Sequence, residues 1–193
     1  MLEICEVGVE GLSEYAQIPI AFEVRSMLKA VLMEGGLGGI RLCEEAVAEP
    51  YLKDYDDAEE GFPEDWPQQF DVSNWGILIA KEHDRSVGGA VVAHNTAGVN
   101  MLEGRSDLAV LWDIRVRPGA RRQGIGTRLF QHAAGWARER GCRQLKVETQ
   151  NVNVPACRFY ARQGCELGTI HRFRYAGHPK VGHEVMLLWY LDL

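Results

Sequence analysis

The stretch that decides the fold reads Val116-Arg117-Pro118-Gly119-Ala120-Arg121-Arg122-Gln123-Gly124-Ile125-Gly126. It follows an apolar run that alternates like a strand, and it precedes an amphipathic segment with helical spacing. Glycine lacks a Cβ atom, so a turn at Gly124 and Gly126 lets the main chain approach a ligand closely. The first turn of the following helix adds unpaired N–H groups and a positive dipole. We therefore expect an anion-binding loop that suits a pyrophosphate.

The segments around this loop repeat one plan of strand followed by helix. Leu108 to Val116 predicts a strand whose apolar side chains share one face, with Asp113 and Arg115 on the other face. The helix after the loop ends near Gly141, where a left-handed residue is expected. A second strand spans Gln144 to Thr149. Asn153 is the expected N-cap of the next helix, Pro155 lies in its first turn, and this short helix ends near Gly164.

The rest of the chain is read from periodicity and from turn residues. Residues from Leu12 to Glu34 have helix-like spacing interrupted at Pro19, and a glycine-rich run then ends the segment. The acidic stretch Glu49 to Phe70 predicts a long loop. Further strands are expected at Leu2 to Val7, Ile40 to Cys43, Trp75 to Ala80 and Gly89 to Ala93, with a closing hairpin of Leu167 to Tyr175 and Glu184 to Tyr190.

Composition limits the class of protein. A chain of 193 residues with 46% hydrophobic and 25% charged residues is expected to form a single domain, residues 1–193. Five cysteines without a C-x-x-C pair, and scattered histidines, predict neither disulfides nor a metal site. We expect a cytoplasmic protein that does not bind membranes, because no long apolar run or signal-peptide pattern is present.

The net charge of −6 hides two oppositely charged segments. Glu44 to Asp71 contains eleven acidic residues and one basic residue, whereas Arg105 to Arg174 contains fourteen basic and five acidic residues. This division suits an enzyme that joins an anionic cofactor to a cationic substrate. Nucleic acid is a less favoured partner, because the arginines lie largely on one helix and its loop without interleaved aromatic residues.

The order of these parts resembles the GNAT acetyltransferases. The loop fits that family's Q/R-x-x-G-x-G/A pattern as Arg121-x-x-Gly124-x-Gly126, and the second strand and helix fit it through Asn153, Ala156, Tyr160 and Gly164. The resemblance implies an α/β (α+β) fold with a mixed, mostly antiparallel sheet of six to seven strands flanked by helices. Two central strands of that sheet would be splayed at the cofactor site.

A narrower resemblance is to the streptothricin acetyltransferases. It rests on five stretches that are spread over the chain from residue 50 to residue 191. They are Pro50-Tyr51-Leu52-Lys53-Asp54-Tyr55-Asp56, Asp113-Ile114-x-Val116, Glu148-Thr149-Gln150-Asn151-Val152-Asn153-Val154-Pro155-Ala156-Cys157, Tyr175-x-Gly177 and Glu184-Val185-Met186-Leu187-Leu188-Trp189-Tyr190-Leu191.

The resemblance implies acetyl-CoA as cosubstrate, without a metal. Its pyrophosphate would lie on the amides of Arg122 to Thr127, and its pantetheine would pair like a strand with the backbone near Ile114 and Val116. An unpaired strand edge is needed for such pairing. The residues implied in cofactor binding are Ile114, Arg115, Val116, Arg121, Arg122, Gln123, Gly124, Ile125, Gly126, Thr127, Asn153, Ala156 and Tyr160.

Transfer of the acetyl group to an amine requires a base and an acid. A lysine-like ammonium, with a pKa of about 10.4, must lose its proton before the amine can attack. Glu148, twelve positions before Tyr160 as in ribosomal-protein amino-terminal acetyltransferases, is the first candidate base, directly or through water. Asp113 is the second candidate. Tyr160 is the implied general acid for the departing thiolate, and each of the three has a purely structural alternative.

Three functions remain open at this point. The first is acetylation of a small cationic amine, with streptothricin as the specific guess. The second is acetylation of a protein amine, and the third is a CoA-binding regulatory domain without turnover. The sequence also leaves open the physiological acceptor, a monomer or a homodimer, and whether the segment Glu49 to Phe70 covers the substrate.

Overall fold

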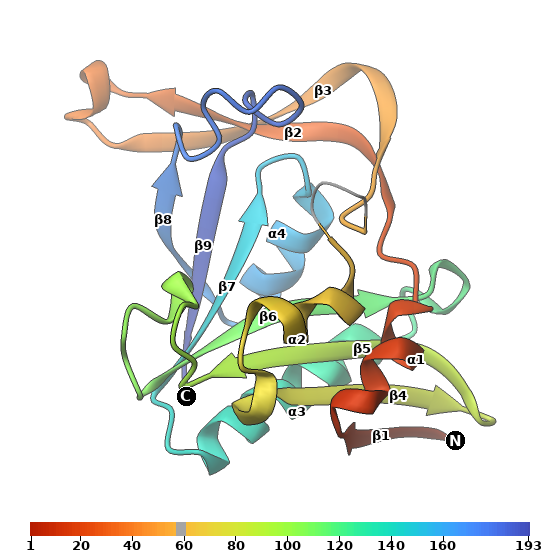
Figure 1. Cartoon of the computed structure of the whole chain (residues 1–193). Helices are drawn as coiled ribbons and strands as arrows, with labels where there is room; N and C mark the ends of the chain where they lie inside the picture. The colour runs from red at the N-terminus through yellow and green to blue at the C-terminus, as the bar shows by residue number, and fades with distance from the viewer. Residues whose placement is uncertain (57–60) are drawn as a thin grey trace. The chain divides into compact units, whose positions relative to one another are not determined.

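The computed structural model, drawn in Figure 1, describes residues 1–56 and 61–193. The expected mixed α/β class is confirmed. Seven strands form one sheet in the order β1-β4-β5-β6-β7-β9-β8, with mostly antiparallel neighbours, and β2 and β3 form a separate pair. The strands are Leu2–Val7 (β1), Phe22–Leu32 (β2), Ile40–Lys53 (β3), Gly76–Glu82 (β4), Arg85–His94 (β5), Leu108–Val116 (β6), Gln144–Gln150 (β7), Glu166–His171 (β8) and Met186–Asp192 (β9).

The described residues also form four α-helices and several 3-10 turns, and none of these helices is long and apolar enough to cross a membrane. The helices are Leu12–Ala16 (α1), Trp66–Gln69 (α2), Ile125–Glu139 (α3) and Val154–Arg162 (α4). The chain packs into two compact units. The first unit contains Met1–Ala21, Asp54–Val147 and Leu191–Leu193, and the second contains Phe22–Lys53 and Glu148–Tyr190.

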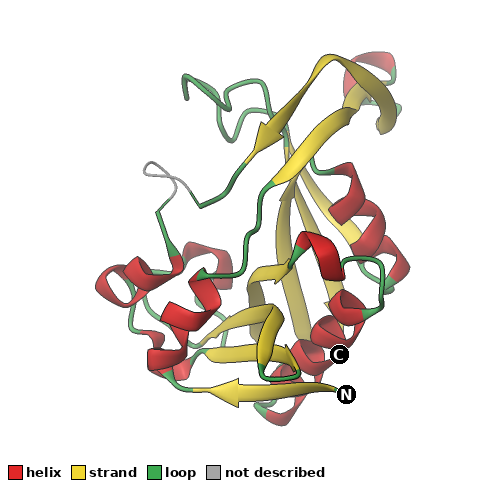
Figure 2. Ribbon diagram, turned by 90° about the vertical axis from the view of Figure 1, so that its right-hand side faces the viewer, coloured by secondary structure: helices red, strands yellow, loops and turns green. Residues whose placement is uncertain are grey.

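In the first unit, helices cover both faces of the central strands. Tyr15 of α1 is fully buried in a cluster with Ile79 of β4. On β5, a Cβ atom at Gly88 would meet Leu129 of α3, and Gly88 pairs with Ala80, the neighbour of Ile79. Because side chains alternate along a strand, α1 and α3 lie on opposite faces, as Figure 2 shows. Burial on both faces explains why these strands read as continuous apolar runs.

β6 contains a bulge that the sequence did not reveal. The pairing register between β5 and β6 shifts there, so that Trp112 is an extra residue on β6. Trp112 packs against the cluster that contains Tyr15, and Asp113 and Arg115 contact Tyr15 as well. The expectation that Asp113 and Arg115 lie on the face opposite Trp112 is therefore wrong, because one inserted residue interrupts the alternation.

The two edges of β6 are used differently. One edge pairs with β5 along its length, up to the pair Gly88 and Val116. The other edge pairs in parallel with β7 at four positions only, from Leu108 with Gln144 to Leu111 with Val147. Within the described residues, the β6 backbone beyond Leu111 therefore has a strand partner on one side alone, as expected for strands that part.

The second unit begins with a hairpin where a helix was expected. The helix prediction for Leu12 to Glu34 is correct only at α1, because Phe22–Leu32 forms strand β2. β2 pairs with β3 from Phe22 opposite Lys53 to Leu32 opposite Ile40, and a glycine-rich turn joins the strands. Pairing with the next strand of the hairpin outweighs local spacing here.

The same hairpin corrects the acidic loop predicted for Glu49 to Phe70. β3 extends to Lys53, so the first residues of that stretch are a strand. A 3-10 turn at Pro63–Asp65 and helix α2 occupy its later part. Residues 57–60 of the predicted loop lie outside the described residues.

The other predicted elements are confirmed with shifts at their ends. The helix after the loop is α3, and Gly141 has a φ of 77° just beyond its end. The second strand and helix are β7 and α4, and the closing hairpin consists of β8 and β9. Strands β1, β4 and β5 match the predicted runs.

Asn151 joins three segments of the second unit. Its main chain accepts a hydrogen bond from the Leu28 amide at 2.9 Å and donates one to the Val185 carbonyl at 2.9 Å. Its side chain donates to the Leu28 carbonyl at 2.9 Å and accepts from the Val185 amide at 2.8 Å. The residue is only 2% exposed, so these bonds lie away from solvent. One buried amide thus holds β2 and the segment before β9 to the end of β7.

We predict that Asn151→Ala lowers the free energy of unfolding by about 2–4 kcal/mol, because it leaves two buried main-chain groups without partners. Chemical denaturation monitored by tryptophan fluorescence measures the loss. Asn100→Ala, at an exposed asparagine, is the control and should change stability by less than about 0.5 kcal/mol. Equal stability of the two variants would show that Asn151 does not hold these segments together.

Candidate active site

The loop between β6 and α3 has the predicted turn at Gly124, whereas Gly126 lies in the first turn of helix α3. Arg122 has a φ of 64° and Gly124 a φ of 82°, so two residues of the loop are left-handed. Gly124 is the N-cap of α3. The space where a side chain would lie is empty, since a Cβ atom added to Gly124 would meet no other atom within 4 Å. The glycine is therefore required by its backbone angle and not by crowding.

The amides that follow are oriented for an anion. The first bond of the helix runs from the Arg128 amide to the Gly124 carbonyl at 3.1 Å. An α-helix leaves the amides of its first turn without acceptors inside the helix, which here include those of Ile125 and Gly126. Ile125 is only 2% exposed, so its side chain packs into the protein and is not a ligand contact. This geometry fits the predicted pyrophosphate site.

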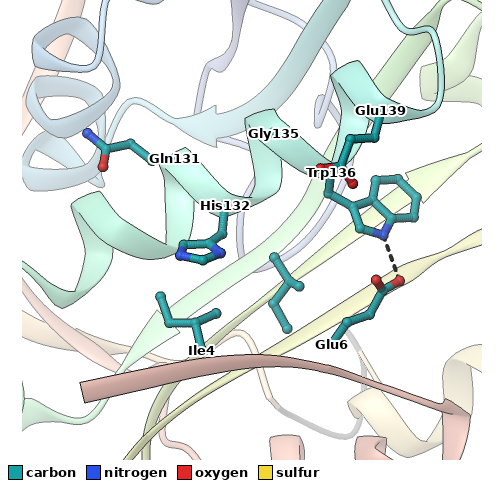
Figure 3. A pocket seen from close by; sticks show the side chains of 8 residues that line it. Ile4, Glu6, Gln131, His132, Gly135, Trp136 and Glu139 are labelled. Carbon is teal, nitrogen blue, oxygen red and sulfur yellow. Dashed lines mark hydrogen bonds between the residues drawn. The ribbon is translucent and has the colours of Figure 1, made fainter. Parts of the chain in front are cut away.

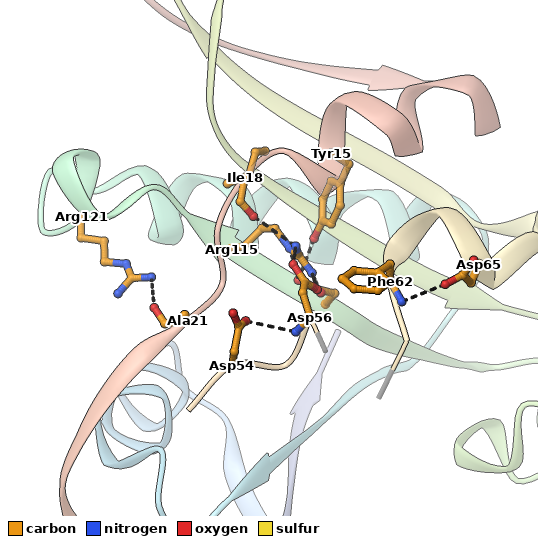
Figure 4. A network of polar contacts seen from close by, with 10 residues as sticks. Tyr15, Ile18, Ala21, Asp54, Asp56, Phe62, Asp65, Arg115 and Arg121 are labelled. Atoms are coloured by element: carbon orange, nitrogen blue, oxygen red, sulfur yellow. Dashed lines mark hydrogen bonds and ion pairs between the residues drawn. The ribbon is translucent and has the colours of Figure 1, made fainter. Parts of the chain in front are cut away.

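Arg121 stabilises the loop from inside the first unit. Its Nε donates to the Val116 carbonyl at 2.9 Å and its Nη2 donates to the Ala21 carbonyl at 3.0 Å, as Figure 4 shows for Ala21. Burial lowers the pKa of Arg121 from its usual value. Part of the guanidinium is thus engaged with carbonyl oxygens, whereas Arg122 is exposed at the loop surface.

Beside the loop, β6 carries a buried charge network (Figure 4). The Arg115 side chain is 1% exposed and forms ion pairs with Asp113 and, at 2.6 Å, with Asp56. It also donates to the Ile18 carbonyl at 3.1 Å. Tyr15 Oη donates to Asp113 at 2.8 Å, and burial followed by the charge of Asp113 raises the pKa of Tyr15.

This network bears on two predicted residues. Both oxygens of Asp113 are engaged, one with Tyr15 and one with Arg115. Those are the contacts of a structural carboxylate, and they leave it poorly placed to take a proton from a substrate. The Arg115 guanidinium is likewise held by protein groups, so it is not available to a cofactor.

In the second unit, Glu148 at the end of β7 belongs to a triangle of side chains. Tyr175 Oη donates a short hydrogen bond to Glu148 Oε1. Gln150 Nε2 donates to the same oxygen at 3.3 Å and to Tyr175 Oη at 2.9 Å. Glu148 is half-buried, which leaves the carboxylate partly accessible. Of the two candidate bases, Glu148 is the one whose second oxygen has no hydrogen-bond donor within the described part of the chain.

Helix α4 positions the other predicted residues of the second unit. Asn153 caps it, since its side chain accepts from the Ala156 amide at 3.2 Å. The expected N-cap is therefore confirmed. Tyr160 lies two turns further along the helix and is 4% exposed, and its ring packs edge-on against Phe159 at 5.2 Å between centroids.

The predicted residues thus fall into two groups, one in each unit. The first unit holds Asp113, Ile114, Arg115, Val116 and the loop Arg121 to Thr127, and the second holds Glu148, Asn153, Ala156 and Tyr160. Sequence reasoning missed the partners of the carboxylates. Tyr175, Gln150, Tyr15 and Asp56 were not singled out as site residues, although all of them except Tyr15 stand in the stretches that carry the narrower resemblance.

A separate hollow of about 390 Å³ lies in the first unit between α3 and the strands β1 and β4 (Figure 3). None of the predicted site residues lines it. Two of its polar side chains are already engaged, because Trp136 Nε1 donates to Glu6 at 2.7 Å. Among residues 1–56 and 61–193, no three metal-ligating side chains gather in one place.

Comparison with known proteins defines the class. Residues 41–165 match the acetyltransferase (GNAT) family, and the chain belongs to this family. It is 32% identical to a streptothricin acetyltransferase of Escherichia coli over 155 residues, which cover 79% of this chain and 76% of that protein. It is 28% identical to streptothricin acetyltransferase A of Bacillus subtilis (strain 168) over 133 residues, covering 68% and 76% of the two chains.

Two solved structures have the same fold. A Bacillus anthracis str. Ames protein, named as a candidate streptothricin acetyltransferase and solved with acetyl coenzyme A, is 28% identical with a TM-score of 0.76, covering 100% of this chain and 98% of that one. A nourseothricin acetyltransferase aligns with a TM-score of 0.75 at 24% identity, covering 99% and 98% of the chains. Acetyl-CoA is thus bound in one structural neighbour. The second likeness, below 25% identity, supports the fold alone.

We predict that Gly124→Ala raises the Kd for acetyl-CoA about tenfold, because an L-residue resists the left-handed backbone and displaces the amides that follow, at a cost of about 1–2 kcal/mol. Isothermal titration calorimetry measures the change. Gly119→Ala in the same loop is the matched control, since Gly119 has no positive φ and open space around it. Unchanged affinity in Gly124→Ala would remove this loop from the cofactor site.

Proposed function

We propose that the chain transfers an acetyl group from acetyl-CoA to a primary amine of a small cationic substrate, with streptothricin as the specific acceptor. The observation that carries the proposal is the left-handed loop before α3, in a family member whose relatives include streptothricin acetyltransferases. The acidic residues between Glu44 and Asp71 support a cationic acceptor, because they favour approach of positive charge.

The proposed cofactor contacts follow from the backbone. The pyrophosphate binds the amides from Arg122 to Thr127, and the pantetheine pairs with the β6 edge near Ile114 and Val116. A main-chain N–H near Ile114 polarises the thioester carbonyl as negative charge develops on its oxygen. The family match at residues 41–165 includes parts of both units, and we propose that they form one acetyltransferase domain.

The proposed reaction is a direct attack with one proton accepted and one donated. The pKa of a lysine-like ammonium lies about three units above neutral pH. Removing its proton at neutral pH therefore costs roughly 4 kcal/mol before the amine attacks. Glu148 takes this proton, directly or through water, and the free amine forms a bond to the acetyl carbonyl carbon. The carbon–sulfur bond then breaks, and Tyr160 donates its proton to the departing thiolate. The nitrogen of the new amide gives up its second proton, which restores Tyr160.

Acetylation of a protein amine is the second candidate. It is supported by a Bacillus subtilis (strain 168) protein that is named as a candidate [ribosomal protein bS18]-alanine N-acetyltransferase. The two chains are 29% identical over 83 residues, which cover 43% of this chain and 53% of that protein. The shorter coverage favours the small-molecule acceptor.

We predict that the purified protein releases free thiol from acetyl-CoA when streptothricin is added, because acetyl transfer liberates CoA. A thiol-reactive dye measures the rate, and peptides with free amino termini or lysines serve as competing acceptors. Faster turnover with the peptides would favour the second candidate. No release above hydrolysis between about pH 6 and pH 9, the range that spans ordinary amine and carboxyl titration, would contradict both if it held for all of these amines.

We also predict different outcomes for the two carboxylates. Glu148→Gln lowers kcat about 100-fold, a typical loss for a general base, and leaves the free energy of unfolding nearly unchanged. Asp113→Asn lowers kcat less than about tenfold but destabilises the protein by about 3 kcal/mol, because it breaks a buried ion pair. Steady-state kinetics and chemical denaturation measure both effects. The reverse pattern would make Asp113 the base.

A further inference from the structure

The side chains of Glu148, Gln150 and Tyr175 form a triangle of hydrogen bonds, and their chemistry decides which group donates each hydrogen. Gln150 and Glu148 lie two positions apart on β7, so their side chains emerge on the same face of the strand. Gln150 Nε2 carries two hydrogens, and it contacts both Glu148 Oε1 and Tyr175 Oη. Tyr175 Oη accepts one of them, and its own hydrogen goes to Glu148 Oε1.

All of these donors therefore meet at one carboxylate oxygen. Oε1 of Glu148 receives bonds from Tyr175 and Gln150, whereas no donor to Oε2 occurs in the described part of the chain. Two donors on the same oxygen restrict the rotation of the carboxylate, because hydrogen bonds to a charged group are strong and directional. The free oxygen is then the one that can take a proton.

The surroundings keep Tyr175 a donor. Burial and then the charge of Glu148 raise the pKa of Tyr175, so the phenol keeps its proton throughout the neutral range. The charge of Glu184 acts in the same direction, but this carboxylate is itself paired with Lys53 at 2.7 Å in a buried ion pair. Glu148, by contrast, forms no ion pair with any cation among the residues that the structure describes, and its hydrogen-bond donors are neutral.

Tyr175 itself is placed by the loop after β8. The His178 amide donates to the Tyr175 carbonyl at 2.9 Å, and the Ala176 amide donates to the Phe173 carbonyl at 3.2 Å. Gly177 between them has a φ of 90°, which allows the tight turn. The loop therefore holds the phenol from its main chain, separately from β7.

We propose that Tyr175 is a positioning residue that fixes the Glu148 carboxylate so that Oε2 accepts the proton of the acceptor ammonium. The inference rests on the proposed function, in which Glu148 is the base. It adds a residue 27 positions away in the chain that acts through Glu148 and touches neither the amine nor the thioester. Gln150 completes the arrangement by orienting the phenol.

The test is a double-mutant cycle on kcat. Tyr175→Phe removes only the hydroxyl, and we expect it to lower kcat about tenfold, with unchanged acetyl-CoA affinity and little change in the KM of the acceptor. In the Glu148→Gln background the same change should lower kcat no further, because the carboxylate that Tyr175 positions is gone. Tyr190→Phe, whose ring lies over Gly168 of β8, is the matched hydroxyl control and should keep the parental kcat.

Each result has a separate meaning. A Glu148→Gln variant that is slow, with a double variant equally slow, supports the positioning role. If the losses from the two changes multiply, or if Tyr175→Phe keeps full kcat, the positioning role is overturned while Glu148 remains the base. If Glu148→Gln keeps full kcat with every acceptor, the proposed base falls and the positioning role falls with it. Denaturation of each variant separates a loss of kcat from a loss of folded protein.

Discussion

The structure depends on how the backbone of β6 uses its two edges. One edge is paired with β5 up to Val116, and the other is paired with β7 only as far as Leu111. A strand inside a sheet normally satisfies both edges, so a half-paired end needs another partner or solvent. The same strand leads directly into the loop with left-handed Arg122 and Gly124. The pantetheine of acetyl-CoA is an extended chain with amides, and it is followed by a pyrophosphate. This order matches the open edge of β6 and the loop that follows it in the sequence.

A strand with one open edge must be held in place from its faces. Arg115 does this in the first unit, because its buried guanidinium contacts Asp113 on its own strand, Asp56, and the Ile18 carbonyl after α1. Buried charges of this kind add little net stability, since desolvation offsets their attraction. Their effect is geometric, because each group loses several kcal/mol if its partners move away. We infer that the network fixes β6 at the cost of making Asp113 unavailable for chemistry.

The parts that could be predicted from the sequence are those with local causes. Gly124 forms the expected turn, Gly141 is left-handed after its helix, and Asn153 caps its helix, and each of these acts within a few residues. The segment that forms strand β2 has helix-like spacing and was expected to be helical. It is a strand because it pairs with β3 across a glycine-rich turn, and local spacing does not record such pairing. The bulge at Trp112 is likewise set by its neighbour β5. Contacts between distant positions, such as Tyr175 with Glu148, leave no periodic signal in a single sequence.

The two candidate bases show why contacts decide more than position in the chain. Both carboxylates stand on central strands, and both accept a bond from a tyrosine whose pKa is raised by burial. Asp113 has a guanidinium on its second oxygen, so protonating it would disrupt a buried ion pair. Glu148 has neutral donors on one oxygen only, so a proton can reach the other without breaking a contact. These contacts therefore favour Glu148 over Asp113 as the group that accepts a proton, although each carboxylate has a tyrosine as a hydrogen-bond donor.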